Sequence, residues 1–484
     1  MHDLRKKALL ESRKTTSRKA RSKPEDSPRS SLNSSPNGSP GNSRAGSRAN
    51  SRPNSRPGSR YASEDEGVTD EELDDNMTMS TDSASGDDAF EESPSNTWTD
   101  RLNDRIAELQ DRKGTSVQGR EATLKAYLHL IRHHYAQEQL DKHVSDVIPA
   151  LLKIIKGGSS EEERSLAIKA LTVTIFTCPS DSEAVVKQVL STLKVVCKDS
   201  EEENIKAEAI QALGILVMYG GGKEEEERSE GMLDYLLEII ESDGQEANAD
   251  DSAPVVTAAL QAWAFVATHL DHLEVQIDRA MEVFMEQLDS TDPDVQTSAG
   301  SNIALLLEVA REYEEETGET MDLSSHDQYK VMTRMEEIRK TSAKSVSKKA
   351  RSRLHENFQS IITSLERGVG PYYSTALKMS NPHSGGNRGG EEIREFGYRK
   401  QLRVQSKVMI IDTWILQTRL EMFKNLLSGG LNVHIEENPV MQDALEGEWE
   451  EFVSSPVARP RAIERGPRQK DTKAAKRRLF AQEL

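Results

Sequence analysis

Apolar residues recur at helical spacing through residues 98–316. Several segments carry small residues and leucines three or four positions apart, as at Ile168, Leu171 and Ile175. One buried face of an α-helix has this period, whereas a half-buried strand alternates at every second residue. The pattern therefore predicts helices whose bodies lie at Ser165–Thr177, Ile205–Met218, Val255–Leu270 and Val295–Ala310.

Start signals for these helices recur along the same region. S-x-x-E sequences run from Ser160 to Glu163, from Ser180 to Glu183 and from Ser200 to Glu203. Such a capping box pairs a serine hydroxyl and a glutamate with the first free amides of a helix. Asp292-Pro293-Asp294 is another start signal. Two helices per unit give a period of about forty residues, and about five HEAT or armadillo units fit, with a surface loop expected within Glu224–Asp251.

The densest apolar block of the chain is residues 404–446. Val408, Ile411 and Ile415 fall on one helical stripe, and so do Leu416, Leu420, Phe423 and Leu427. Gly429-Gly430 is expected to stop this helix through a left-handed cap. Leu431, Val433 and Ile435 alternate as in a short extended segment. Asn438-Pro439 then restarts a helix, with asparagine as N-cap and proline at the first position.

One or two further helices are predicted at 325–366. Their apolar stripe, Phe358, Ile361, Ile362 and Leu365, is expected to dock on the C-terminal domain at 325–447, which a Gly/Ser/Pro-rich loop interrupts at 370–390. The fold class is therefore all-α: a HEAT/armadillo-like α-solenoid at 98–316 and a small, mostly helical C-terminal domain.

Composition changes the picture at both ends of the chain. The 484 residues are 35% hydrophobic and 30% charged, with a net charge of −19, and the length suits two or three domains. Residues 1–60 hold 15 basic and 4 acidic side chains, while residues 61–100 hold 14 acidic and no basic ones. Residues 1–97 are therefore expected to be a disordered Ser/Arg-rich and then acidic tail. Its Ser-Arg repeats make phosphorylation candidates of Ser43, Ser47, Ser51, Ser55 and Ser59, and a plain solvated linker is the alternative.

The sequence contains no catalytic signature. It lacks a Gly-x-Ser-x-Gly elbow, a Walker A loop and a His-Glu-x-x-His pair. His129 and His133 share a helix face but have no further zinc-ligand pattern, and Asp412 is interpreted as a helix cap. Cys178 and Cys197 fit small core residues of a protein from a reducing compartment, and Trp263, Trp414 and Trp449 fit packing residues. No apolar run is long enough to span a bilayer, and the N-terminus lacks the apolar region of a secretory signal. We expect no enzyme activity, metal, cofactor, membrane contact or small-molecule substrate.

The amino-acid sequence of the block at 404–446 also resembles that of a known family. Ile411-Asp412-Thr413-Trp414, then Phe423-Lys424, then Gly429 to Glu437 are similar to the C-terminal domain of the interferon-related developmental regulator family. The segment Ser298–Arg311 resembles the end of the same family's N-terminal helical domain, so the likeness covers about residues 98–447. The resemblance implies two activities, namely binding of translationally inactive ribosomes and transcriptional co-regulation.

Two basic segments are candidate RNA-binding sites. Residues 330–353 carry nine basic and two acidic side chains, and the basic tail 456–484 carries nine and three. Cations that neutralise phosphates release counterions and bind without regard to sequence. The candidates are Lys344, Lys348, Lys349, Arg351, Arg353, Arg459, Arg461, Arg465, Arg468, Lys470, Lys473, Lys476, Arg477 and Arg478. A nuclear localisation signal or a merely soluble tail is the alternative for the basic tail.

These observations favour a non-enzymatic regulator that binds ribosomes or ribosomal RNA and represses translation or marks inactive ribosomes. The solenoid surface is expected to bind protein partners. The alternative is a nuclear transcriptional co-regulator that acts as a protein-binding scaffold. The expected location is the cytoplasm, with the nucleus as a second compartment left open.

Overall fold

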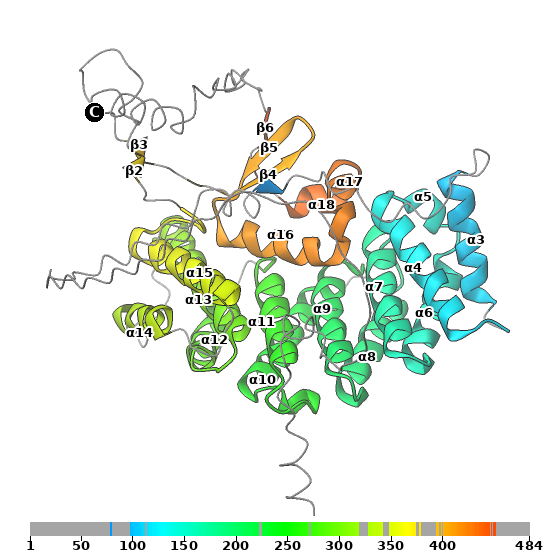
Figure 1. The fold of residues 1–484 in the computed structure, drawn as a ribbon, viewed down its shortest axis with the longest axis horizontal. Coiled ribbons are helices and arrows are strands. Elements are labelled where there is room, and N and C mark those ends of the chain that lie inside the picture. Colours follow the sequence, from blue (N-terminus) through cyan, green and yellow to red (C-terminus); the bar gives the residue numbers. More distant parts are fainter. Residues whose placement is uncertain are drawn as a thin grey trace, which may run out of the picture. The chain divides into compact units, whose positions relative to one another are not determined.

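The computed structural model describes residues 78–79, 97–111, 114–221, 225–270, 273–318, 328–341, 348–373, 377–378, 394–395, 398, 400–445, 447 and 449–451. All of them belong to one compact unit within Gly67–Leu484 (Figure 1). Most of the expected tail at 1–97, most of the loop at 370–390 and the basic tail at 456–484 lie outside these residues.

Thirteen helices of the described residues precede residue 370. They are α3 Trp98–Gln110, α4 Val117–His133, α5 Gln137–Leu140, α6 Val144–Gly157, α7 Glu161–Thr177, α8 Glu183–Asp199, α9 Glu203–Tyr219, α10 Glu225–Glu241, α11 Ala253–Ala267, α12 Glu274–Gln287, α13 Pro293–Thr317, α14 Gln328–Thr341 and α15 Lys348–Arg367.

These helices form two rows. Helices α4, α7, α9, α11, α13 and α15 pack side by side in one row, and α6, α8, α10, α12 and α14 each pair with a member of it (Figure 1). Helices α7, α9, α11 and α13 start 42, 50 and 40 residues apart. The predicted α-solenoid with a period of about forty residues is confirmed. The longer interval holds a loop at residues 242–252 with a short 3-10 helix at Gln245–Ala247, while α10 takes up most of the stretch that was expected to contain it.

The row of α7, α9 and α11 forms the centre of the core because neighbours cover these helices on several sides. Helices α9 and α11 approach so closely that a Cβ built on Gly214 would lie 2.9 Å from the Cβ of Ala262. Trp263 is fully buried and its ring lies 4.9 Å from that of Phe284. Cys178 and Cys197 are buried and unpaired, as expected of small core residues.

The helix starts are predicted more accurately than the capping residues. Ser160 caps α7, since its hydroxyl accepts from the amide of Glu163 at 3.0 Å. Helix α8 instead begins after Ser182, and α9 begins after Glu202, so Ser180 and Ser200 are not N-caps. Ser200 is the residue that ends α8. Asp292 caps α13 through the amides of Asp294 and Val295, as its Asp-Pro-Asp sequence predicts.

The C-terminal elements mix a small sheet with helices. They are β2 Leu377–Lys378, β3 Arg394–Glu395, β4 Gln401–Val404, β5 Lys407–Ile410, α16 Trp414–Leu427, the 3-10 helix η3 Ser428–Gly430, α17 Leu431–Glu437, α18 Pro439–Ala444 and β6 Trp449–Glu451. Strands β4, β5 and β6 are antiparallel, and β1 Thr78–Met79 lies parallel to β4. The C-terminal domain is therefore mostly helical, as predicted, but it carries a hairpin that the pattern did not reveal.

Several local predictions in this block are wrong. Val408 lies in strand β5 and not in the helix, which begins only at Trp414. The segment Leu431–Glu437 is helical and not extended. The cap of α16 is Thr413, whose hydroxyl accepts from the amide of Leu416 at 3.1 Å, and not Asp412. Asn438 and Pro439 start α18 as predicted, with the Asn438 side chain accepting from the amide of Val440.

The apolar stripe of α15 packs mainly on the solenoid and not on the C-terminal domain. A Cβ added to Gly300 of α13 would lie 3.1 Å from Ile361 and 3.3 Å from Phe358. Helices α14 and α15 thus continue the two rows beyond α13. Among the described residues, no helix combines the length and the apolar character that crossing a bilayer requires.

Candidate functional site

Few of the basic residues singled out by their charge can be placed. Lys348, Lys349, Arg351 and Arg353 fall within the first six residues of α15, in a part of that helix whose side chains the structure does not describe. Lys344 and all nine cations of the tail, together with the five serines of the Ser-Arg repeats, lie outside the described residues. The site that the structure does resolve is the contact between the C-terminal helices and the solenoid.

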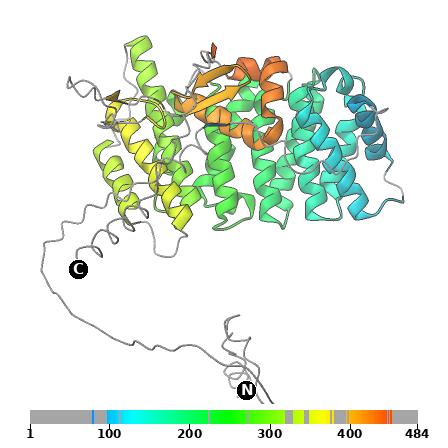
Figure 2. The same cartoon turned by 45° about the horizontal axis from the view of Figure 1, so that its top comes forward.

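Helix α16 crosses the solenoid where its central helices end (Figures 1 and 2). Phe423 of α16 packs among three aromatic side chains from the last turns of α7, α9 and α11. Its ring centroid lies 5.4 Å from that of Phe176, 5.9 Å from Tyr219 and 5.4 Å from Phe265. We call the contact of residues 414–445 with α4, α7, α9, α11 and α13 the seam.

Polar contacts in the seam satisfy helix ends, whose first amides and last carbonyls have no partner within the helix. Glu308 of α13 accepts from the amides of Trp414 and Ile415 at 2.6 and 3.2 Å, so its carboxylate serves the start of α16. Arg419 of α16 donates to the carbonyl oxygen and the hydroxyl of Thr268, which ends α11. It also donates to the carbonyl of Ala444 at 3.0 Å, linking α16, α18 and the solenoid.

A third contact joins α17 and the η3 turn to α4. The ring Nε2 of His434 lies 3.1 Å from the carbonyl oxygen of Ile131 in the last turn of α4. A Cβ built on Gly430 would lie 1.9 Å from the carbonyl oxygen of Arg132. The predicted left-handed glycine is absent, because Ser428 is the residue with positive φ, at 48°, and Gly430 has φ −90°. The glycine is needed for close approach of two backbones.

Burial shifts the pKa values of ionisable groups in the seam. Desolvation raises the pKa of Glu308 to about 7, although the two amides it accepts from pull in the opposite direction. Desolvation also lowers the pKa of His269 to about 3 and that of His434 to about 4. Both histidines are therefore neutral at physiological pH, and Glu308 titrates close to it.

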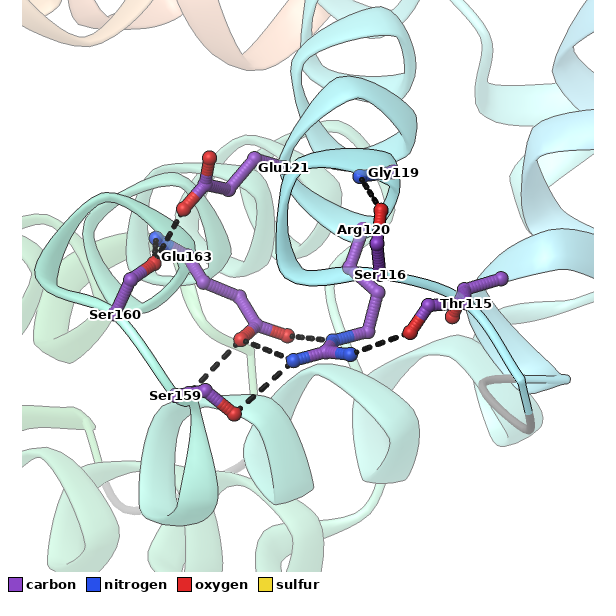
Figure 3. A network of polar contacts seen from close by, with 8 residues as sticks. All are labelled: Thr115, Ser116, Gly119, Arg120, Glu121, Ser159, Ser160 and Glu163. Atoms are coloured by element: carbon purple, nitrogen blue, oxygen red, sulfur yellow. Dashed lines mark hydrogen bonds and ion pairs between the residues drawn. The ribbon is translucent and has the colours of Figure 1, made fainter.

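A separate polar network joins the starts of α4 and α7 (Figure 3). Arg120 donates to Glu163 at 2.8 Å and to the carbonyl of Thr115 at 2.9 Å. Glu163 is fully buried and accepts from the amide of Ser159 at 2.9 Å, so it does not close a capping box on Ser160. A buried carboxylate with a guanidinium and an amide as partners is a structural feature of the repeat contact.

The seam also encloses a cavity of about 290 Å³. Helices α11, α13, α15 and α16 line it, together with Tyr372. The polar residues that shape it include Thr257, Gln261, Asp294, Ser298, Ser301, Asn302, Asn357, Gln417, Glu421 and Asn425. We call this the amide cavity.

The sequence pattern does not predict this cavity. Its walls come from α11, from α13 and, more than a hundred residues later, from α16. Only the run of small residues in α13, Thr297 to Ser301, hints that this helix faces something other than a core. Within the described residues no group of three or more histidine, cysteine or acidic side chains could hold a metal ion. The rings of His129 and His133 are tilted by 31° to each other, with centroids 4.1 Å apart.

Comparison with known proteins places this architecture in a family. The model of the family described as "Interferon-related developmental regulator (IFRD)" matches residues 72–366, more than half of the chain. The chain belongs to the interferon-related developmental regulator family. The matched span ends within α15, so it includes the solenoid but not the block at 404–446 on which the sequence resemblance chiefly rested.

Individual relatives are distant. The chain is 27% identical to an uncharacterized protein of Schizosaccharomyces pombe over 56% of this chain and 63% of that one. It is 26% identical to mouse interferon-related developmental regulator 2 over 39% of this chain and 36% of the relative. With pig interferon-related developmental regulator 1 it shares 20% identity over 68% of each. The chain thus spans less than two thirds of the first two relatives.

Solved structures align with about half of the chain. A designed armadillo repeat protein aligns with 55% of this chain and 99% of its own length, at a TM-score of 0.31 and 17% identity. An engineered protein aligns with 54% of this chain at a TM-score of 0.32 and 18% identity.

Proposed function

We propose that this protein is a non-enzymatic regulator that binds ribosomal RNA on ribosomes and represses translation or marks inactive ribosomes. The observation that carries the proposal is the distribution of positive charge. Within an acidic chain, the segments 330–353 and 456–484 have net charges of +7 and +6. Such local cationic segments attract polyanions even when the whole protein is negative.

The cations of the solenoid, unlike those of the basic segments, form ion pairs within the fold. Arg120 pairs with Glu163, Arg228 with Glu183 and Lys169 with Glu208, each across neighbouring helices. Further pairs of this kind are Arg164 with Glu202, Lys198 with Glu246 and Arg279 with Glu241. Six cations of the solenoid are thus paired with acidic side chains of the same fold. After the Ser/Arg-rich segment 1–60, the excess of positive charge lies in the two basic segments.

The position of the first basic segment supports an anionic partner. Helix α15 begins with four cations in six residues, Lys348 to Arg353. The start of a helix carries a partial positive charge, so cations there are unfavourable unless an anion is bound. Two cationic segments on one folded body can engage RNA together, and the second contact then gains from the high effective concentration set by the first.

The solenoid adds a surface for protein partners. Solenoids present extended faces to their ligands, and this one keeps such a face wherever the C-terminal helices do not cover it. The nuclear co-regulator alternative needs only this surface and should not depend on the basic tail.

The test is a sucrose-gradient profile of the tagged full-length protein in growing and starved cells. In one variant the nine cations of the tail become glutamine, and in another Lys348, Lys349, Arg351 and Arg353 do. The control changes four exposed solenoid lysines, Lys125, Lys142, Lys153 and Lys156, to glutamine. We expect wild type and control to sediment with monosomes and the tail variant to move to the top of the gradient.

Salt dependence gives a second readout of the same proposal. Affinity for ribosomes should fall with salt at a log–log slope of roughly −0.7 to −0.9 per phosphate contacted, and each basic variant should reduce that slope. If wild type remains at the top of the gradient in every condition, ribosome binding is wrong and the nuclear co-regulator becomes the leading function. If the control variant dissociates as readily as the tail variant, binding reflects net charge alone.

A further inference from the structure

The small sheet of the C-terminal domain includes a strand from the acidic N-terminal region. The strand order is β1-β4-β5-β6, so β1 covers the edge of β4 that β5 leaves open (Figure 1, the blue arrow beside β4). Thr78 lies opposite Gln401 and Met79 opposite Leu402, in a parallel register. An open strand edge presents unpaired N–H and C=O groups, which an extended segment can pair with. The edge of β4 is thus a docking surface that one segment of this chain occupies.

Strand β4 is fixed in the domain independently of β1. Leu402 and Val404 are buried, at 0% and 4% exposed, while Gln401 and Arg403 are exposed. Strand β5 pairs with all four residues of β4, whereas β1 pairs with only the first two. Because the β1 ladder is short and parallel, it rests on few hydrogen bonds, each with a modest net contribution. The contact of β1 can therefore open while the hairpin of β4 and β5 stays folded.

The charges of the two partners are complementary. Residues 70–92, which include β1, hold ten acidic and no basic side chains. The stretch 399–411, which includes β4 and β5, holds four basic and no acidic ones. Asp75 is three residues from Thr78, so their backbones are at most about 11 Å apart in any conformation. Pairing of β1 with β4 therefore holds a strongly acidic segment close to a cationic hairpin.

The same sheet holds the start of the basic tail. Strand β6, Trp449–Glu451, forms the other edge, and the tail begins at residue 456, only five residues further along the chain. Neighbouring strands lie about 4.8 Å apart, so β1 and β6 are separated by about 14 Å across β4 and β5. Two oppositely charged segments that are tethered this closely meet at a high effective concentration.

We propose that the edge of β4 is the docking site of the acidic segment 70–92, and that docking sets this segment against the basic tail. The carboxylates then occupy cations that RNA phosphates would otherwise contact, so β1 restrains RNA binding. The docking needs only β4 and the acidic segment, whereas the restraint rests on the proposed RNA-binding function.

The docking is tested on the full-length protein by fluorescence anisotropy with a labelled peptide of residues 70–86. Thr78→Pro/Met79→Pro removes both amides of β1, and one of them faces β4 because successive amides of a strand point to opposite sides. This variant leaves the edge open and should bind the peptide at least about tenfold more tightly than wild type, whose own strand competes. The control Ser83→Pro/Ser85→Pro keeps β1 and every charge, and it should bind as wild type does.

A second peptide separates strand pairing from attraction between charges. It carries Thr78→Pro/Met79→Pro, has the same charge as the first, and should not bind because proline cannot donate to the ladder. Hydrogen exchange gives an independent readout. The β4 amides that face β1 should exchange at least about tenfold faster in the Thr78→Pro/Met79→Pro protein than in wild type or the control. The helices of the solenoid should exchange equally in all three proteins.

The restraint is measured separately with a labelled single-stranded oligouridine. At low salt, the Thr78→Pro/Met79→Pro protein should bind it severalfold more tightly than wild type and the Ser83→Pro/Ser85→Pro control do. The difference should shrink as added salt screens the charges.

Several results would overturn these inferences. Equal binding of the two peptides would exclude strand pairing, and equal affinity of wild type and the open variant for the first peptide would mean that β1 does not occupy the edge. A wild-type dimer that the prolines at β1 abolish would assign the strand to a second copy of the chain. Equal affinity of the three proteins for oligouridine would exclude the restraint. If none of them binds oligouridine or ribosomes, the proposed function fails, while the peptides still decide the docking.

Discussion

At the scale of single residues, Gly430 shows how a glycine can serve a distant contact. The Gly429-Gly430 pair predicts the end of a helix, and α16 does end nearby. The reason for the second glycine lies elsewhere, because its Cα faces the carbonyl group of Arg132 about three hundred positions earlier. An added Cβ would lie 1.9 Å from that oxygen and 2.4 Å from its carbon. Nothing local in the sequence encodes this requirement.

Gly430→Ala should therefore destabilise the protein. The η3 turn and α4 must move apart to admit the methyl group, and overpacking of this kind typically costs about 1–3 kcal/mol. Gly231→Ala is the matched control, since Gly231 lies on an exposed face of α10 with open space around it. There alanine should stabilise by about 0.5–1 kcal/mol through its helix propensity. Urea unfolding measures both, and a stabilising Gly430→Ala would show that the close approach is not maintained in solution.

The residues of the candidate site were the hardest to predict. Glu308 lies inside the Ser298–Arg311 segment that resembles the family, yet its partner amides belong to residues 106 and 107 positions later. The cavity that Gln417 and Thr257 line forms only where α16 docks on α11. Buried residues such as Cys178, Cys197 and Trp263 were predictable because their packing role depends mainly on side-chain type.

At the scale of elements, periodicity predicted where helices lie better than it predicted how they begin. A serine or glutamate near the start of a helix either caps that helix or contacts a neighbouring repeat. Glu183 pairs with Arg228 of α10 at 3.0 Å, and Glu163 pairs with Arg120 of α4. The box spacing alone cannot tell a capping glutamate from one that reaches a neighbouring helix.

The missed hairpin has a similar cause. Val408, Ile411 and Ile415 fit a helical stripe, but Leu402, Val404 and Val408 to Ile410 also fit two short strands joined at Gln405-Ser406. Gln405 takes a positive φ of 48°. Glutamine rarely adopts this turn conformation, so the residue does not predict a turn in the sequence. Short apolar runs are ambiguous between the two periods. The pairing of β5 with β6 stabilises the strand conformation.

The start of α16 should be sensitive to pH through Glu308. Its pKa of about 7 in the folded protein lies above the value of about 4.3 in an unfolded chain. Between these values the folded state binds more protons than the unfolded one. The stability that Glu308 contributes is thus fully present below about pH 4.3 and is lost as the pH rises through 7.

Glu308→Gln isolates this contribution, because glutamine can still accept from the amides of Trp414 and Ile415 but does not titrate. Relative to the variant, wild type should lose about 1–2 kcal/mol of unfolding free energy between pH 6 and 8.5. His269 and His434, whose folded pKa values are lowered, favour folding above about pH 6.5 and act in the opposite direction, but they are present in both proteins. Urea unfolding at a series of pH values gives the difference. A difference that does not vary with pH would mean that Glu308 is ionised throughout.

At the scale of the whole described unit, the seam changes the cooperativity with which a solenoid folds. In a plain repeat array each unit contacts only its neighbours, so stability is a sum of local terms and the ends can unfold separately. Here α16 contacts α7, α11 and α13, while α17 contacts α4. Repeats separated by more than a hundred residues are thereby joined through one element.

Phe423→Ala should expose this coupling. Removing a fully buried phenylalanine from among Phe176, Tyr219 and Phe265 should cost about 3–5 kcal/mol. Because the lost contacts are those that bridge distant repeats, the unfolding transition should also broaden, with a lower apparent slope against urea as parts of the solenoid melt independently. Far-UV circular dichroism follows the helices, and tryptophan fluorescence reports on all four tryptophans, namely Trp98 and Trp263 in the solenoid, Trp414 in α16 and Trp449 in β6.

Phe284→Leu is the control, since it perturbs the solenoid at Trp263 without touching the seam. That variant should shift the midpoint and leave the two probes coincident, as in wild type. In Phe423→Ala the fluorescence change should precede the loss of helix, because α16 detaches before the repeats unfold. If both variants keep coincident, equally steep transitions, cooperativity comes from the repeats alone, and the C-terminal helices are only attached to a solenoid that would fold in the same way without them.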